Sequence, residues 1–235
     1  MRYIILTLTL LFSIHSFSQV EDEILEKINN KNYKQAIEDA TKLIPNNSDE
    51  ELVAYLYYLR AFSYRSIKNY FNAKKDYLKS IELGYRYEGA YQDLAAIYFN
   101  EQDYTNAALY YEKQLDLLGG DDIFAHYNIG LSNYNAKNYN TAVKYFSNVI
   151  SINSDEETVA NAYEMRGKSK NNIKSQTGCD DLITSVDLHL RALILEKRWG
   201  YNTDIDYIYN SYCTSKKMYN FYFRQWKKNS KWMFK

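Results

Sequence analysis

Small and aromatic positions recur along this chain at a fixed spacing. Residues 69–80 read NYFNAKKDYLKS, and 34 residues later residues 103–114 read DYTNAALYYEKQ, with the same residue classes in the same places. A period of 20–50 residues is typical of solenoids, in which each repeat packs only on its neighbours. The pattern predicts an all-α solenoid of stacked helical hairpins.

The apolar positions between the turns follow the spacing of helices. One Pro and eight Gly in 235 residues leave few breakers, which favours helices joined by short connections. We expect helical segments at 20–29, 33–44, 51–68, 70–83, 88–100, 104–118 and 156–171. The turn Gly119–Asp122 adds one residue, so the next repeat is offset by 35.

The recurring positions have a packing explanation. Small residues are expected where two helices approach closely: Ala61, Ala95, Gly130 and Gly167 on the first helices, and Ala73, Ala107 and Ala142 on the second. Aromatic residues are expected to fill the space between the helices: Tyr70, Tyr77, Tyr104, Tyr111, Tyr139 and Phe146. A single hairpin cannot bury its apolar stripe alone, so neighbouring hairpins must stack.

This pattern resembles the tetratricopeptide repeat over about residues 20–188. The resemblance implies a solenoid of about five repeats over residues 19–190, followed by a C-terminal helical extension and tail over 191–235. The near-terminal Pro of the family is missing from the repeats that start at 54 and 88. The fifth repeat resembles the final repeat of exported Bacteroidetes proteins of this family, with Cys179 in place of the expected Ala and Leu182 in place of a Trp.

The first 18 residues have the three regions of a secretory signal peptide. Arg2 supplies a positive charge, residues 3–14 are mostly apolar, and Ser16–Ser18 gives a small-x-small cleavage site before Gln19. The apolar run is shorter than the roughly 20 residues that span a bilayer. We therefore expect an exported protein, periplasmic or secreted; the alternative is a buried N-terminal helix.

The resemblance implies that the first helix of each repeat lines a concave groove. Carried over by position, the groove-lining residues are Tyr55, Tyr58, Phe62, Arg65, Gln92, Ala96, Phe99, Phe124, Tyr127, Leu131, Tyr134, Asn161, Glu164, Lys168 and Asn171. Aromatic walls suit extended peptides, so the predicted function is a non-enzymatic scaffold that binds a protein or peptide partner. The alternative is an unoccupied groove whose tyrosines reflect compositional bias. The family's chaperone-tail clamp is excluded because Tyr58 and Phe62 stand where it needs Lys and Asn.

The zero net charge conceals a basic tail. Residues 214–235 hold seven Lys or Arg and no acid, so the remaining residues carry 22 bases against 29 acids. Aromatic residues alternate with these bases, which is typical of segments that contact membranes or anionic polymers. The contact candidates are Arg224, Trp226, Lys227, Lys228 and Trp232. The alternative is a cap on the open end of the solenoid. Nucleic acid is not an expected partner of an exported protein.

No pattern in the chain supports catalysis, a cofactor or a metal. Residues 162–169, AYEMRGKS, match a permissive phosphate-loop pattern but fall inside a predicted helix, where Gly167 has a packing role. After export only His126 and His189 remain, without partners at ligand spacing. Acidic pairs such as Asp121–Asp122 and Asp180–Asp181 lie near predicted helix starts, where they complement the helix dipole.

Cys179 and Cys213 are predicted to form a disulfide, because they are the two cysteines of a chain expected in an oxidising compartment. Closing a loop of about 34 residues would stabilise the fold by roughly 3–4 kcal/mol. The alternative is two small buried side chains. Thiol labelling of the non-reduced mature protein is expected to find no free thiol, and two labelled cysteines would exclude the bond.

Overall fold

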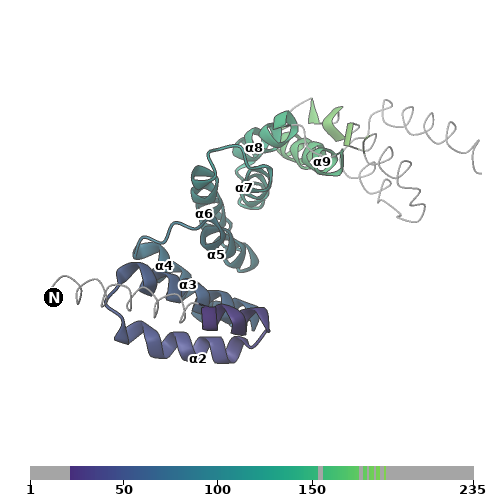
Figure 1. Cartoon of the computed structure of the whole chain (residues 1–235). Coiled ribbons are helices and arrows are strands. Elements are labelled where there is room, and N and C mark those ends of the chain that lie inside the picture. Colours follow the sequence, from purple (N-terminus) through teal and green to yellow (C-terminus); the bar gives the residue numbers. More distant parts are fainter. Residues whose placement is uncertain are drawn as a thin grey trace, which may run out of the picture. The chain divides into compact units, whose positions relative to one another are not determined.

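The structure is a computed structural model that describes residues 22–152, 156–174, 177, 178, 180–182, 184, 185 and 188. All its regular secondary structure within these residues is helical (Figure 1). Residues 22–29 and every described residue from 178 to 188 are helical. Between them lie α2 (Tyr33–Leu43), η1 (Ile44–Asn46), α3 (Glu50–Ser66), α4 (Tyr70–Glu82), α5 (Glu88–Asn100), α6 (Tyr104–Leu117), α7 (Ile123–Asn135), α8 (Tyr139–Ile152) and α9 (Glu156–Asn172).

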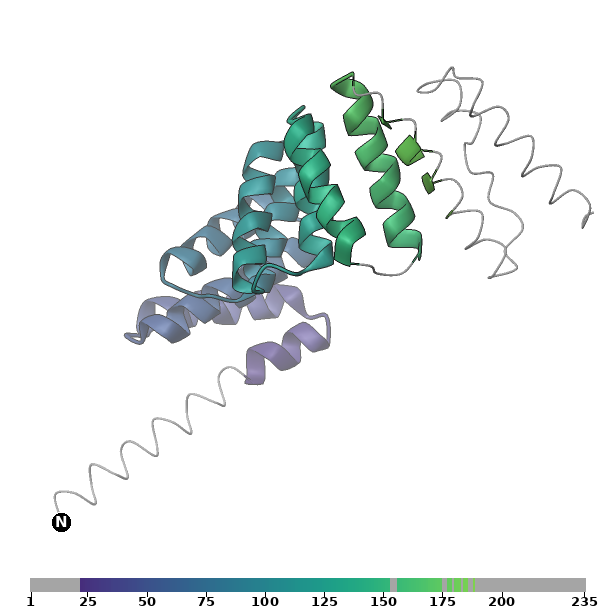
Figure 2. The ribbon, with the colours of Figure 1, turned by 90° about the horizontal axis from the view of Figure 1, so that it is seen from above.

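The chain divides into an N-terminal unit, Met1–Glu101, and a C-terminal unit, Gln102–Lys235. In the N-terminal unit, α2 packs on α3, α3 on α4 and α4 on α5; in the C-terminal unit, α6 packs on α7, α7 on α8 and α8 on α9 (Figure 2). The predicted helical hairpins are therefore confirmed, with helix ends at or within two residues of those expected for α2 to α6 and α9.

Each unit has its own apolar core. In the N-terminal unit, a cluster of buried side chains from the 22–29 helix, α2 and α3 contains Ile24, Ala36, Ala40, Leu52, Leu56 and Leu59. In the C-terminal unit, α8 and α9 supply Ala142, Phe146, Val149 and Ala162. Burying one side chain of the size of Leu or Phe stabilises a fold by about 1.5–3 kcal/mol, so these clusters hold neighbouring hairpins together.

Small residues stand where helices approach closely, as the repeat pattern predicts. Ala61 and Ala73 are fully buried. A Cβ added to Gly130 would lie 2.9 Å from a ring carbon of Phe146, and one added to Gly167 would lie 2.8 Å from Cγ of Leu182. These distances are shorter than van der Waals contact, so a larger side chain at either position would push its partner helix away.

The fifth repeat is shifted by one residue from the expected register. Leu182 packs on Gly167 as Phe146 packs on Gly130, and Gly178 stands four residues before Leu182 as Ala142 stands four residues before Phe146. The small-residue position therefore belongs to Gly178, which is buried, and not to Cys179. Cys179 and Cys213 themselves lie outside the described residues.

The expected aromatic packing holds for three positions and fails for Tyr70. Tyr77, Tyr111 and Phe146 are buried, whereas Tyr70 is 39% exposed and its neighbour Phe71 is 76% exposed. Tyr70 is the first residue of α4, so no preceding turn of that helix covers it. Tyr104 and Tyr139, which start α6 and α8, are half-buried.

The turn from the first to the second helix of each repeat uses a residue other than glycine in the left-handed region. Lys31, Lys68, Gln102, Lys137 and Lys174 have φ between 58° and 63°. At Lys68 the turn is a Schellman motif: the Lys68 amide donates to the Arg65 carbonyl and the Asn69 amide to the Tyr64 carbonyl, both at 2.9 Å. Asn69 then caps α4 by accepting from the Asn72 amide.

A buried ion pair joins the two helices of the second repeat. Arg60 on α3 donates from Nε to Oδ2 of Asp76 at 2.7 Å and from Nη2 to Oδ1 at 2.9 Å. Its Nη1 donates to Oγ1 of Thr41 on α2 at 3.1 Å. The guanidinium also lies over the ring of Tyr57. Three helices therefore converge on one charged group.

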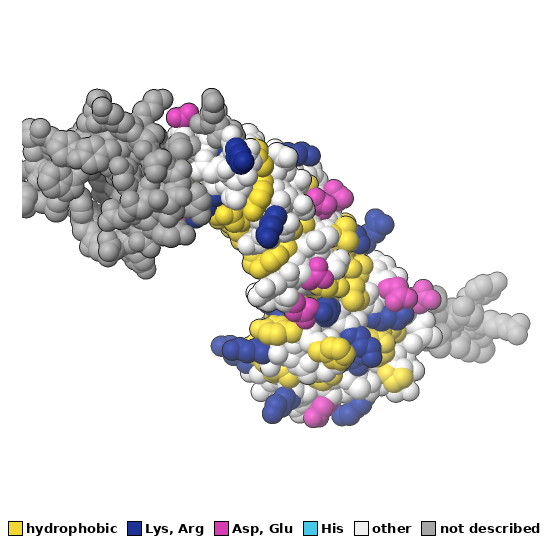
Figure 3. Space-filling view, turned by 180° about the vertical axis from the view of Figure 1, so that it is seen from behind, with side chains coloured by type: hydrophobic (Ala, Val, Ile, Leu, Met, Phe, Trp, Pro, Cys, Tyr) yellow, Lys and Arg dark blue, Asp and Glu magenta, His cyan; other side chains and the backbone are white. Residues whose placement is uncertain are grey.

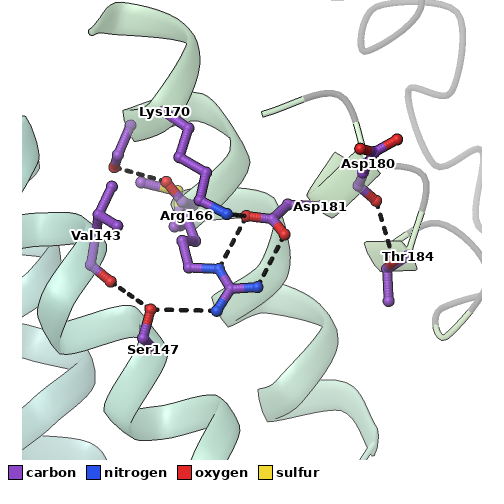
Figure 4. Close-up of polar contacts among 9 residues, drawn as sticks. Val143, Ser147, Arg166, Lys170, Asp180, Asp181 and Thr184 are labelled. Carbon is purple, nitrogen blue, oxygen red and sulfur yellow. Dashed lines mark hydrogen bonds and ion pairs between the residues drawn. The ribbon is translucent and has the colours of Figure 1, made fainter. Parts of the chain in front are cut away.

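The fifth repeat builds the same arrangement from equivalent positions. Arg166 on α9 binds both carboxylate oxygens of Asp181 at 2.8 Å and donates to Oγ of Ser147 on α8 at 3.1 Å (Figure 4). Lys170 adds a second cation, 2.8 Å from Asp181 Oδ2. Asp181 is therefore the partner of two cations, a role that the sequence did not predict.

In the third and fourth repeats, the position of Arg60 and Arg166 is occupied by an apolar residue. The residue before the small residue is Arg60 or Arg166 in the second and fifth repeats, and Leu94 or Ile129 in the third and fourth. Leu94 and Ile129 are fully buried. The residues at the position of Asp76 are then Tyr110 and Tyr145. In the second to fifth repeats, arginine and aspartate thus occur together or not at all.

We expect Asp76→Ala to lower the free energy of unfolding by about 3 kcal/mol, because it leaves the Arg60 guanidinium buried without its carboxylate. The double variant Arg60→Leu with Asp76→Tyr copies the third repeat and is expected to recover most of the loss. Urea denaturation measures both. A loss below about 1 kcal/mol for Asp76→Ala would show that the pair has no structural importance.

Candidate partner-binding site

Two tyrosines of α3 form a flat aromatic surface in the N-terminal unit. Tyr55 and Tyr58 lie one helical turn apart, which places them on the same face of α3. Their ring centroids are 6.2 Å apart and their planes differ by 16°. Both were predicted as groove-lining residues, and both are half-buried.

The segment that joins α4 to α5 adds two more rings. The Tyr85 ring centroid lies 5.7 Å from that of Tyr55 and 5.2 Å from that of Tyr58. Tyr87 meets Tyr58 edge-on at 5.3 Å. Tyr77 of α4 lies 6.1 Å from Tyr58 on the buried side. We refer to Tyr55, Tyr58, Tyr77, Tyr85 and Tyr87 as the tyrosine cluster.

A polar group on α5 holds the buried side of this cluster. The Tyr77 hydroxyl donates to Oδ2 of Asp93 at 2.7 Å, and Nε of Arg65 forms an ion pair with the same oxygen at 3.1 Å. The Arg65 guanidinium also lies over the ring of Phe62. Since Arg65, Tyr77 and Asp93 belong to α3, α4 and α5, the network fixes the three helices around the cluster.

Burial controls the protonation of these groups. It raises the pKa of the Asp93 carboxyl, against the opposing effects of the Tyr77 hydrogen bond and the Arg65 charge. It also raises the pKa of the Tyr77 hydroxyl, with a further contribution from the Asp93 charge. Burial likewise raises the pKa of the Tyr58 hydroxyl. The phenols are therefore neutral at physiological pH and act as hydrogen-bonding groups rather than anions.

In the C-terminal unit the predicted groove residues divide between surface and core. Phe124 is 71% exposed. Tyr127 packs edge-on against Phe146 at 5.6 Å, and Tyr134 packs against Tyr139 at 5.7 Å. Leu131 packs on the same core cluster. Part of each of these three side chains is buried in this packing and stabilises the repeat. Less of their surface is therefore accessible than the sequence predicts.

The remaining predicted residues are mostly polar. Lys168 is paired with Glu164 one turn earlier on α9. Nδ2 of Asn171 is buried without a hydrogen-bond partner, and its Oδ1 lies against Gly178. Gln92 is exposed, whereas Ala96, Phe99 and Asn161 are half-buried. The tail candidates Arg224, Trp226, Lys227, Lys228 and Trp232 lie outside the described residues.

The site contains three residues that the sequence did not reveal. Tyr85 and Tyr87 lie in a connection, where the repeat pattern assigns no packing role, and Asp93 lies next to the predicted position Gln92. The signal available was the aromatic pair on either side of Arg86 in a connection of five residues, 83–87, between two helices. The carboxylate could not be found in this way, because its partners are 16 and 28 positions away.

The described surface carries both apolar patches and charges. On the face drawn in Figure 3, hydrophobic side chains reach the surface in patches, with charges of both signs between them. Within the described ranges no three His, Cys, Asp or Glu side chains group as metal ligands would. His126 is buried, with Nε2 3.0 Å from the Gly120 carbonyl oxygen, which is a structural contact. None of the described helices is both long and apolar enough to cross a bilayer.

Comparison with known structures shows the same fold in several proteins. YrrB, described as a protein of the tetratricopeptide family with an unusual peptide-binding site, is 18% identical with a TM-score of 0.62; the match covers 74% of this chain and 88% of YrrB. MamA from Desulfovibrio magneticus RS-1 is 13% identical with a TM-score of 0.60, over 79% and 97% of the two chains. BtubC from P. vanneervenii is 14% identical with a TM-score of 0.58, over 79% and 82%. At such identities the likeness shows the fold alone. No curated protein matches the chain in sequence.

A family model identifies three of the repeats directly. The tetratricopeptide repeat model matches residues 54–83, 88–117 and 125–156, which cover α3 to α8. The match starts each repeat at a first helix, as the spacing of the small residues predicts. On these three matched repeats and its stacked helical hairpins, the chain is a tetratricopeptide repeat protein.

Proposed function

We propose that this protein is an exported, non-enzymatic scaffold that binds an extended segment of a protein partner on the first helices of its repeats. The observation that carries the proposal is the tyrosine cluster. It presents Tyr87, which is 40% exposed, and the half-buried rings of Tyr55 and Tyr58 at the surface. The export rests on the signal-peptide pattern of residues 1–18.

The chemistry of the cluster suits a peptide. Tyrosine gives large, rigid contact area at low cost in side-chain entropy, and its hydroxyl can hydrogen-bond to a peptide backbone. The buried network of Arg65, Tyr77 and Asp93 fixes the rings in advance, which lowers the entropic cost of binding. The peptide-binding site named for YrrB supports the same use of this fold.

Affinity capture from the envelope extract of the source cell tests the proposal. We expect Tyr58→Ala to reduce recovery of a directly bound partner at least tenfold, because the ring contacts the four others of the cluster. Phe71→Ala is the matched control, since Phe71 is an exposed aromatic residue on a second helix. Circular dichroism melts establish that both variants are folded.

The double variant Tyr127→Ala with Tyr134→Ala extends the test to the C-terminal unit. It is expected to lower partner recovery and also thermal stability, because both rings contact the core of the fourth repeat. If Tyr58→Ala and this double variant leave every captured partner unchanged, the first helices do not form the binding surface.

A second candidate function rests on the tail. Its seven bases without an acid, alternating with aromatic residues, favour attachment to an anionic membrane or polysaccharide surface. In this proposal the protein is peripheral to the envelope and the repeats extend from it.

Co-sedimentation with vesicles separates this candidate from a capping role. We expect the mature protein to bind vesicles with 30% anionic lipid, and a version without residues 216–235 to lose at least ten times its affinity, since each base near the surface contributes about 1 kcal/mol. Neutral vesicles are the control. Equal binding by both proteins would leave the tail without a membrane role.

A further inference from the structure

The surface offered by Tyr55 and Tyr58 is partly covered by the chain itself. Tyr85 lies within 6 Å of both rings, and no other residue of the tyrosine cluster contacts both. It belongs to neither α3 nor its partner helix but to the connection between α4 and α5. The Tyr85 ring therefore lies against both of the α3 rings that are proposed to bind the partner.

Backbone hydrogen bonds tie the start of the connection to the end of α4. The Tyr85 amide donates to the Ser80 carbonyl at 3.1 Å, and the Gly84 amide to the Ile81 carbonyl at 3.0 Å. Gly84 has a φ of 91°, and a Cβ added there would meet nothing within 4 Å. Glycine adopts positive and negative φ about equally readily, so the connection can turn at Gly84 while α4 and α5 stay in place.

The rings of the connection contact other rings at tilted and edge-on angles. Tyr87 contacts Tyr58 at 5.3 Å and Tyr85 at 6.0 Å, with interplanar angles of 80° and 50°. Tilted and edge-on contacts of this kind select aromatic side chains, because the edge of one ring meets the electron-rich face of the next. The site is thus shaped for a planar ring.

We propose that Tyr85 is an internal ligand of this site and that the partner carries an aromatic side chain that displaces it. This inference rests on the proposed function and adds the chemistry of the partner: an extended segment with Tyr, Phe or Trp at the position that enters between Tyr55 and Tyr58. While the Tyr85 ring lies against Tyr55 and Tyr58, the site is closed. The apparent association constant of the partner is then its intrinsic value multiplied by the fraction of molecules in which the site is open.

The probe is a fluorescein-labelled peptide with the sequence GYRYEG, which is the chain's own residues 84–89. Its anisotropy is titrated with the purified protein and with Tyr85→Ala. We expect Tyr85→Ala to bind the peptide about tenfold more tightly than the unchanged protein. The same peptide with alanine in place of its first tyrosine is the matched control and is expected to bind neither protein measurably.

Three variants keep the experiment decisive. Tyr58→Ala added to Tyr85→Ala is expected to abolish the gain, while Phe71→Ala leaves binding as in the unchanged protein. Tyr85→Leu replaces Tyr85→Ala if the latter is too unstable to purify. It keeps apolar bulk in the site without a ring, so we expect a gain in peptide affinity of about threefold. Thermal melts by circular dichroism accompany each titration.

Binding of the peptide by Tyr85→Ala no tighter than by the unchanged protein would overturn the internal-ligand inference. If Tyr58→Ala still lowers recovery of the natural partner in that case, the first helices bind a partner without displacement of Tyr85. If neither substitution changes binding, the proposed function fails as well. A gain that persists after Tyr58→Ala would also overturn the inference, because the peptide would then bind elsewhere.

Discussion

A guanidinium buried between helices is stable only when a carboxylate meets it, and the second and fifth repeats depend on this constraint. Removing an arginine from water costs several kcal/mol, and its carboxylate partner repays that cost only with good geometry. Arg60 and Arg166 each meet both oxygens of an aspartate at 2.9 Å or less. Because each aspartate comes from the following helix, the pair requires that the hairpin be closed.

The same groups also join neighbouring repeats. The third nitrogen of each guanidinium, Nη1, donates to a hydroxyl on the preceding repeat. This hydroxyl belongs to Thr41 for Arg60 and to Ser147 for Arg166, 19 positions earlier in both cases. Apolar packing of the kind made by Leu94 and Ile129 tolerates small shifts, whereas a bidentate ion pair accepts one register. We infer that the polar pairs contribute to the specificity of stacking more than to its free energy.

The sequence was sufficient for the features that repeat and insufficient for those that do not. Helix order and packing positions such as Ala73 and Gly130 followed from the period, because every repeat must meet the same steric requirement. The Arg60–Asp76 pair did not, since its members are 16 residues apart and absent from the two following repeats. In the fifth repeat the separation of Arg166 and Asp181 is 15 residues instead of 16, so its second helix stands one residue earlier than the period predicts. The small-residue position was therefore assigned to Cys179 instead of Gly178. At Lys68 the chain accepts a left-handed lysine where glycine is usual, so composition gave no sign of the turn.

For the candidate site the limit was of a different kind. Tyr55, Tyr58 and Arg65 could be placed on the first helix by their position in the repeat. Whether their surface is open depends on the connection after α4, which obeys no repeat pattern. Tyr85 and Tyr87 belong to that connection, and only the three-dimensional structure brings them against α3.

The tyrosine cluster therefore combines a structural role in the core with a proposed binding role at the surface. Tyr77 is fully buried, and its hydroxyl is held by Asp93, so it belongs to the core. Tyr87 is partly exposed, and its ring packs against those of Tyr58 and Tyr85. Tyr58 touches both. A change in the outer rings can thus occur without loss of the inner network, because Arg65 and Asp93 keep α3, α4 and α5 together. That separation is what allows a connection of five residues to move over a site while the helices that form it remain fixed.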